Sequence, residues 1–169
     1  MTDSTSTRSQ ILSKADIKRR LYRMAIEVAE HNTGEDSLVI AGIEGNGMVV
    51  ARHIIDALQQ VQPYNMTLVE VKLDKKHPLE VTIMPEADFS GKNILVVDDV
   101  ADSGRTLLYA LKPFLQFQPK KIQTLVLVER DHKNFPVTTD FVGLSLSTTL
   151  QEHIRVETEG TEILGAWIH

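Results

Sequence analysis

The pattern of hydrophobic and polar positions along this chain switches repeatedly between strand-like and helix-like periodicity. Three short apolar runs and one strictly alternating segment have the pattern of strands. They lie at residues 94–97, 38–41, 122–128 and 67–73. Apolar residues recur at helical spacing over residues 17–28 and 50–58. Because strands alternate with helices, we expect an α/β fold built on a doubly wound parallel sheet.

The two ends of the chain have a different character. Residues 1–11 are polar and rich in Ser and Thr, which predicts a flexible tail before a single domain at residues 12–169. A further helix is expected from Gly104 to Leu115. Strand-type residues then recur at residues 141–144, 154–156 and 163–168. They predict a small C-terminal β unit, called the hood below, appended to the main sheet.

Composition narrows the class of protein further. The chain has 169 residues, a net charge of −5 and no cysteine. Disulfides and thiolate metal sites are therefore excluded. No apolar run approaches membrane-spanning length, and we expect the protein to be cytoplasmic. The acidic balance argues against broad nucleic-acid binding.

The richest chemistry lies at residues 93–107, NILVVDDVADSGRTL. An apolar strand is followed by Asp98 and Asp99, which places two carboxylates where open α/β sheets bind ligands. A short loop then leads into a helix whose first N–H groups attract phosphate, and Gly104 permits close approach of an anion. The loop adds further donors and a cation: Ser103, Thr106 and Arg105. The pattern predicts a phosphate on the loop beside sugar hydroxyls on the carboxylates.

A plainer interpretation is an Asp-rich turn in which Asp102 or Ser103 only caps a helix. The segment is not a nucleotide-binding P-loop, because GxxxxGK[ST] occurs nowhere in the chain. The combined strand, acid pair and loop favour the phosphate-sugar interpretation.

The same segment resembles the phosphoribosyl-diphosphate (PRPP) signature of type I phosphoribosyltransferases. Residues 127–132, 135–136 and 140–143 resemble the bifunctional pyrimidine operon attenuator/uracil phosphoribosyltransferase family. The resemblance covers most of residues 12–157. It implies transfer of 5-phosphoribosyl from PRPP to a nucleobase, most simply uracil, with release of pyrophosphate in nucleotide salvage.

The resemblance also implies roles for individual residues. It implies that the catalytic residues are Asp98, Asp99 and Asp102. It also implies that the 5′-phosphate is bound by Asp102, Ser103, Gly104, Arg105 and Thr106. In the same way, pyrophosphate is expected to be bound by Gly45, Asn46, Gly47, Lys75 and Lys76. The nucleobase is expected to be bound by Arg130, His132 and Val142. A mobile lid is expected at residues 74–86. Mg²⁺ is expected to be held through PRPP and water, with no direct protein ligand, and a homodimer or higher homo-oligomer is expected.

Alternatives stay open at several of these positions. The three glycines of residues 42–47 are as consistent with a tight turn as with a pyrophosphate-binding loop. Lys75 and Lys76 are as consistent with a solvated turn as with a catalytic role. Without the family, His132 is a surface-loop histidine. The cations of residues 18–23 form a solvated helix face, or else contact an acidic partner.

The function has alternatives too. Asp102 stands where several 6-oxopurine phosphoribosyltransferases carry an aspartate against the purine ring, whereas attenuator proteins tend to have tyrosine. The pyrimidine relatives usually carry a basic residue in place of Asn46, and the lid is shorter, which suggests an inactive paralogue. A pyrimidine-operon RNA-binding regulator is the remaining possibility, with residues 18–23 and 120–121 as the only obvious basic candidates.

Overall fold

A central sheet of six strands forms the body of the computed structural model, which describes residues 7–169. Its strands are β2 (Ser37–Ile43), β3 (Asn65–Leu73), β4 (Val81–Met84), β5 (Asn93–Ala101), β6 (Lys121–Arg130) and β7 (Phe141–Leu146). The order across the sheet is β4-β3-β2-β5-β6-β7, and every pair is parallel except β3 with β4. The predicted α/β fold with a parallel sheet is confirmed.

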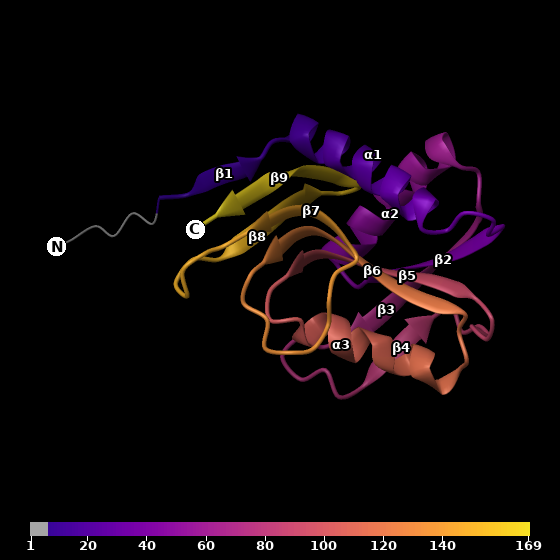
Figure 1. Ribbon diagram of the computed structural model, residues 1–169. Coiled ribbons are helices and arrows are strands. Elements are labelled where there is room, and N and C mark those ends of the chain that lie inside the picture. The colour runs from indigo at the N-terminus through magenta and orange to yellow at the C-terminus, as the bar shows by residue number, and fades with distance from the viewer. Residues whose placement is uncertain (1–6) are drawn as a thin grey trace.

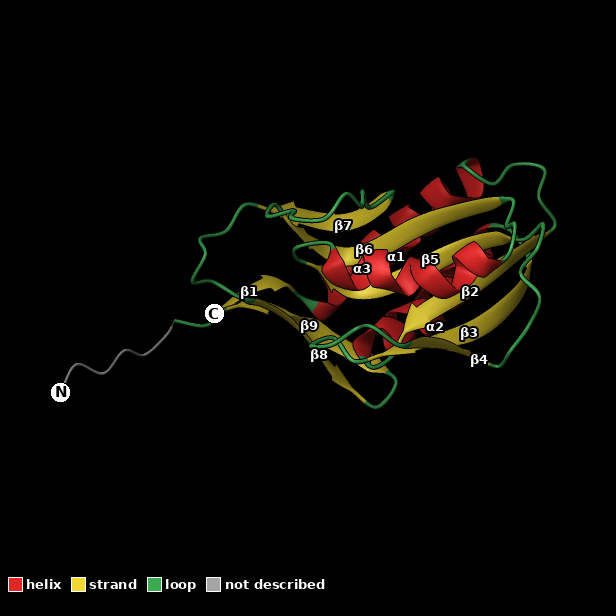
Figure 2. Ribbon diagram, turned by 90° about the horizontal axis from the view of Figure 1, so that it is seen from below, coloured by secondary structure: helices red, strands yellow, loops and turns green. Residues whose placement is uncertain are grey.

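Helices cover both faces of this sheet, as a doubly wound fold requires. α1 (Lys14–Glu30) and α2 (Asn46–Val61) lie on one face, while α3 (Arg105–Leu111) and the 3₁₀ helix η1 (Lys112–Gln116) lie on the other (Figures 1 and 2). Two apolar clusters result, one beneath α1 and α2 and one beneath α3 and η1. The central strands β2 and β5 are almost wholly buried, which explains their continuous apolar runs.

A second, antiparallel sheet sits beside the body and forms the hood. Its order is β1 (Ser9–Leu12), β9 (Glu162–Ile168) and β8 (Ile154–Glu159) (Figure 1). The predicted flexible tail is therefore wrong for residues 9–11, because β1 pairs with β9 and buries Leu12. The part of that tail before residue 7 lies outside the described residues.

The hood differs from the sequence prediction at one strand. Residues 141–144 belong to β7, which pairs with β6 as the last strand of the main sheet. The stretch that carries the family resemblance, residues 127–143, thus ends the body and does not form the hood. Strand propensity marked these residues correctly, but only the pairing partner decides which sheet a strand joins.

Two element ends also differ from expectation. Asp98 and Asp99 lie inside β5 and not in a turn after it, because β5 keeps pairing with β6 as far as Ala101. The helix expected to run to Leu115 changes to 3₁₀ geometry after Leu111. Pro113 has no N–H to continue an α-helical ladder, which accounts for the change.

Strands β6 and β7 approach each other unusually closely at Gly143. A Cβ at Gly143 would lie 2.3 Å from the backbone oxygen of Leu127. We predict that Gly143→Ala lowers the free energy of unfolding by roughly 2–4 kcal/mol, since backbone atoms on both sides cannot yield. Chemical denaturation against Ser145→Ala, an exposed position of the same strand, measures this. Equal stability of the two variants would contradict it.

Candidate active site

The candidate site lies at the carboxyl ends of β2 and β5, where the direction of strand addition reverses. From β2 the chain moves to β3 and β4 on one side, and then returns to place β5 on the other. Crevices at such switch points bind ligands in open α/β sheets. The loops that follow β2 and β5 both open onto this crevice, as does the carboxyl end of β6.

A cleft of about 380 Å³ occupies this position. It is lined by nine of the predicted site residues: Asn46, Lys75, Asp99, Asp102, Ser103, Gly104, Arg105, Thr106 and Arg130. Five more predicted residues, Asp98, Gly45, Gly47, Lys76 and His132, lie nearby without lining the cleft. Most residues of one wall and of the floor of the cleft were therefore predicted from the sequence.

The two neighbouring carboxylates occupy different environments. Asp99 lines the cleft and is partly exposed, whereas Asp98 is 1% exposed and lies beneath the floor. Asp98 Oδ1 accepts from the Asp99 backbone N–H at 2.9 Å, and Lys75 Nζ lies 3.6 Å from Asp98 Oδ2. Burial raises the pKa of Asp98 well above 3.8, the neighbouring Asp99 carboxylate raises it further, and Lys75 opposes both. Asp99 is therefore the carboxylate that a ligand in the cleft meets directly.

The phosphate-type loop at residues 102–106 has a fixed backbone. Gly104 has φ +86°, a conformation that favours glycine, and the oxygen of Phe135 lies 3.3 Å from where its Cβ would stand. The backbone oxygen of Ser103 accepts from the N–H groups of Asn134 (2.9 Å) and Phe135 (3.1 Å). The loop after β6 thus holds this loop from behind. Its open side faces the cleft.

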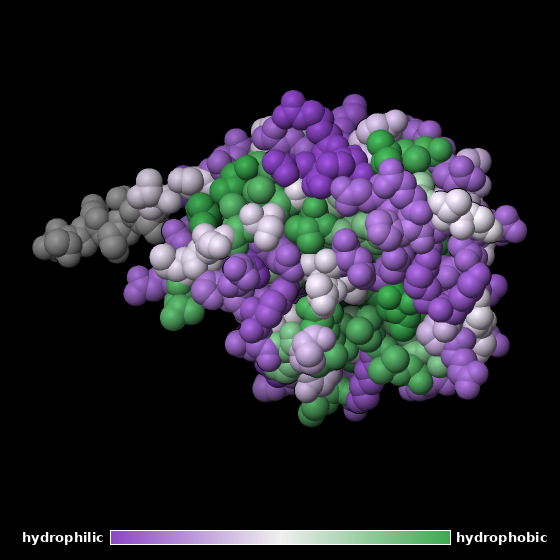
Figure 3. Space-filling model, in the orientation of Figure 1, coloured by the Kyte–Doolittle hydropathy of each residue, from purple (hydrophilic) through white to green (hydrophobic). Residues whose placement is uncertain are grey.

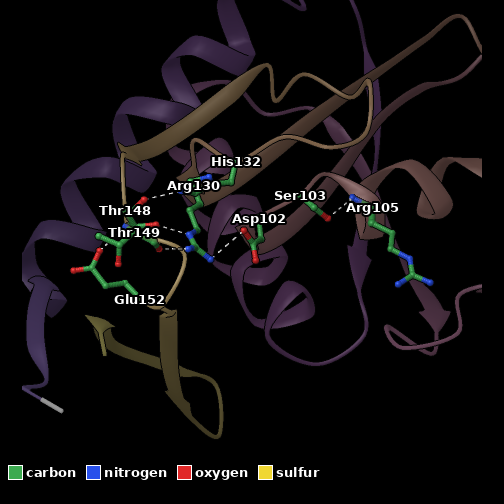
Figure 4. A network of polar contacts seen from close by, with 8 residues as sticks. All are labelled: Asp102, Ser103, Arg105, Arg130, His132, Thr148, Thr149 and Glu152. Atoms are coloured by element: carbon green, nitrogen blue, oxygen red, sulfur yellow. Dashed lines mark hydrogen bonds and ion pairs between the residues drawn. The ribbon is translucent and has the colours of Figure 1, made fainter. Parts of the chain in front are cut away.

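The loop at residues 74–80, part of the predicted lid, is tethered to α3, to η1 and to the floor. Lys112 Nζ donates to the backbone oxygen of Leu79 at 3.0 Å, and Arg105 Nη2 to that of Lys76 at 3.4 Å. Lys75 reaches the buried Asp98 from the same loop. Figure 4 shows the Arg105 side chain directed away from Asp102. The side chain of Lys76 is exposed and does not line the cleft.

Arg130 and His132 organise the loop that precedes the hood. Arg130 is buried, lies 3.3 Å from Asp102 Oδ1 and donates to Thr148 Oγ1 and the backbone oxygen of Thr149 (Figure 4). His132 Nε2 lies 2.6 Å from the backbone oxygen of Thr148. Arg130, which was predicted to lie near the nucleobase, is thus linked to Asp102. These contacts also fix residues 148–149 at the edge of the cleft.

Val142, which was predicted to contact the nucleobase, lies away from the cleft. It lies on β7, outside the cleft, and its backbone oxygen accepts from Arg23 Nη2 of α1 at 3.0 Å. The neighbouring oxygen of Gly143 accepts from Arg20 and Arg23. These backbone groups bind α1 and are not presented to a base.

Sequence reasoning missed the hood wall of the cleft. It is formed by the first part of β8 and the residue before it: His153, Ile154, Arg155 and Val156. Arg155 adds a cation to this wall, and its side chain is exposed. A strand pattern at residues 154–156 was visible, but no local signal shows that this strand folds back over β5.

A switch-point crevice with an acidic floor, a glycine loop and several cations is typical of α/β proteins that bind phosphorylated ligands. Comparison with known proteins identifies the family. Residues 7–159 match the phosphoribosyl transferase domain family, and the chain belongs to it. It is accordingly an enzyme of the pentosyl-transferring class.

Relatives and solved structures agree with this assignment. The bifunctional protein PyrR of Ligilactobacillus salivarius is 35% identical over 159 residues, which cover 87% of this chain and 89% of that protein. The pyrimidine operon regulatory protein of Lactococcus lactis is 32% identical over 155 residues, 89% and 90% of the two chains. The ternary substrates complex of Trypanosoma cruzi hypoxanthine phosphoribosyltransferase has a TM-score of 0.75 at 18% identity, covering 92% and 93%. The last similarity concerns the fold alone.

The buried Asp98 gives the protein a distinctive pH dependence of stability. An ordinary aspartate titrates near 3.8. Between that value and the raised pKa of Asp98, the folded protein holds a proton that the unfolded chain has lost. The free energy of unfolding therefore falls as pH rises through this interval and levels off above it.

We predict that Asp98→Asn removes this component of the slope and unfolds at higher denaturant concentration than the parent at neutral pH. Asparagine still offers Oδ1 to the Asp99 N–H without the cost of burying a charge. Urea titrations at a series of pH values, with the exposed Asp36→Asn as control, provide the measurement. Parallel pH profiles for Asp98→Asn and the parent would show that Asp98 is not the group responsible.

Proposed function

We propose that this protein transfers the 5-phosphoribosyl group of PRPP to uracil and releases pyrophosphate, forming UMP. The observation that carries the proposal is the single cleft in which the partly exposed Asp99 faces the glycine loop of residues 102–106. A carboxylate and a phosphate-type loop in the same cleft suit the hydroxyl and phosphate ends of a ribose 5-phosphate. Membership of the phosphoribosyltransferase family supports the reaction type.

In this proposal, each part of the cleft has its own task. Residues 102–106 bind the 5′-phosphate, and Asp99 accepts the ribose hydroxyls. As pyrophosphate departs, positive charge builds on the ribose, and the carboxylate of Asp99 stabilises it. The cations of the cleft, Lys75, Arg105 and Arg155, face the anionic groups of the donor. Closure by residues 74–86 would exclude water from the reacting centre.

Mg²⁺ fits this chemistry as a cofactor held mainly by the substrate. Among residues 7–169, no three His, Asp or Glu side chains gather into a metal-ligand set. Mg²⁺ keeps several waters and is commonly bound through one or two carboxylates and substrate phosphates. Asp99 and Asp102 both line the cleft, and because Asp102 pairs with Arg130 we assign the hydrated ion to Asp99. When bound, Mg²⁺ would neutralise charge on the leaving pyrophosphate.

Several features support a pyrimidine over a purine. The proposal of uracil follows the resemblance of residues 127–143 and the relatives named PyrR and pyrimidine operon regulatory protein. Asp102, the residue that suggested a purine, lies beside the guanidinium of Arg130. Arg130 also holds residues 148–149 at that end of the cleft. A purine that used the Asp102 carboxylate would have to share it with the guanidinium of Arg130.

Regulation through RNA ranks second because, apart from the exposed Lys18, the basic candidates make contacts within the protein. Hydrophilic side chains gather over α1 on the face seen in Figure 3. Arg19 pairs with Asp16, Arg23 pairs with Glu27, and Arg20 donates to a β7 backbone oxygen. Lys120 pairs with Glu35, and Lys121 Nζ donates to the backbone oxygen of His31.

No helix within residues 7–169 has the length and apolar character needed to cross a membrane.

Assays with separate free bases test the proposal directly. With PRPP and Mg²⁺, we expect uracil to support pyrophosphate release at least ~10-fold faster than hypoxanthine or guanine, because Arg130 already binds one oxygen of Asp102 and a hydrogen bond to a charged group is worth about 1.5–3 kcal/mol. Coupled detection of pyrophosphate gives the rates. A faster rate with a purine would replace uracil with that base, and no release with any base would refute the enzymatic proposal. A salt-dependent mobility shift with pyrimidine leader RNA tests the second role.

Asp99→Asn tests the role of the exposed carboxylate. We expect kcat to fall by roughly 10²-fold, since the variant removes the charge that faces the developing cation. Thermal unfolding should shift by only a few degrees, because asparagine loses one of the two acceptors used by Asn46 Nδ2 and the Val100 N–H at a partly exposed position. The exposed Asp36→Asn serves as the matched control for both measurements. Unchanged turnover in Asp99→Asn would remove Asp99 from the mechanism.

A further inference from the structure

Asn46 was expected to bind pyrophosphate, but its side-chain amide is fully engaged within the protein. Asn46 Nδ2 donates to Asp99 Oδ2 at 3.1 Å and to the backbone oxygen of Val156 at 2.9 Å. Its Oδ1 accepts from Thr158 Oγ1 at 2.9 Å. Because Val156 O and the Asp99 carboxylate both require a donor, the orientation of the amide is fixed by its partners. Both amide hydrogens and the carbonyl oxygen are thus used.

These contacts join the two walls of the cleft. Asn46 is the first residue of α2, Asp99 lies in the central strand β5, and Val156 lies on the hood strand β8. The side chain of Val156 is 2% exposed and belongs to the apolar cluster beneath α1 and α2. A second side-chain contact between α2 and the hood pairs His53 with the backbone oxygen of Thr161, in the turn between β8 and β9. Asn46 is therefore placed to set the position of β8 at the cleft.

A basic residue at this position could not make the same set of contacts. Lysine and arginine offer only donors, so neither accepts a hydrogen bond from Thr158. Asparagine combines two donors with an acceptor on a short side chain that holds few rotamers. Asn46 and Thr158 are thus complementary to each other, 112 residues apart in the chain. This complementarity gives a physical reason for an amide at position 46.

We propose that Asn46 is a positioning residue, which with Thr158 clamps β8 against the site and orients the carboxylate of Asp99 toward the cleft. Asn46 does not bind pyrophosphate through its side chain. The part that concerns turnover rests on the proposed function, because it requires Asp99 to act on the ribose. The clamp itself is a property of the folded protein without substrate.

The pair Thr158→Val and Thr158→Ser isolates the clamp. Valine keeps the shape of threonine without the hydroxyl, whereas serine keeps the hydroxyl without the methyl group. We expect Thr158→Val to speed amide hydrogen exchange in β8 by roughly 5-fold and to lower kcat by a similar factor, as the loss of one hydrogen bond implies. The KM for PRPP should change less than about 2-fold, since no donor to the substrate is lost. Thr158→Ser should restore both exchange and kcat.

Asn46→Arg separates the clamp from a ligand role. A clamp predicts faster exchange in β8 and a lower kcat, because arginine cannot accept from Thr158. A pyrophosphate ligand predicts the opposite, a lower KM for PRPP and unchanged exchange in β8, since a cation is added to the loop. That second result would overturn the proposal. So would parent-like exchange and kcat in Thr158→Val.

The hydrogen-exchange and kinetic measurements together distinguish failure of the clamp from failure of the proposed function. Exchange is measured on the protein alone and decides whether the clamp exists. If the parent released no pyrophosphate with any base, the proposed function and the Asp99 part of this inference would both be wrong. Faster exchange in Thr158→Val with unchanged kcat would refute the orientation of Asp99 and leave only the clamp of β8.

Discussion

The close approach between the start of α2 and the end of β5 is the constraint on which the site depends. A Cβ at Gly47 would lie 3.0 Å from the backbone oxygen of Val97 and 3.1 Å from Asp98 Oδ1. Glycine lets the helix pack here without displacing the strand. The same approach shields Asp98 from solvent and brings Asn46 beside Asp99. One carboxylate is thereby removed from the cleft while its neighbour is presented to it.

Sheet topology converts this local contact into a binding site. β5 lies between β2 and β6, so the segments that follow three neighbouring strands meet at one edge. The antiparallel hood then closes the remaining side, where β8 crosses in front of the carboxyl end of β5. The walls come from residues as distant in the chain as Asn46 and Val156. A cleft assembled in this way has a floor of parallel strands and a hood wall that packs on the apolar cluster beneath α1 and α2 and is joined to β5 through Asn46.

Charge is distributed unevenly around the cleft. Arg130 lies beside Asp102 and is buried, so its charge is largely committed to the protein. Lys75 reaches the buried carboxylate of Asp98 from the loop after β3, and Arg105 contacts the backbone of that loop. An anionic substrate in the cleft would compete for both of these contacts. The loop is therefore coupled to the site through the same cations that a phosphorylated ligand would attract.

The amino-acid sequence alone was enough to predict the alternation of strands and helices, the acid pair at the end of the central strand and the glycine loop, because each is a local pattern. It could not separate Asp98 from Asp99, since burial depends on how closely α2 packs at Gly47. Nor could it place β7 in the main sheet, β1 in the hood, or Val156 and Arg155 on the cleft wall. Those features depend on pairing between distant segments, for which periodicity carries no information. The role of Asn46 was decided in the same way, by a hydroxyl and a backbone oxygen more than a hundred positions further along the chain.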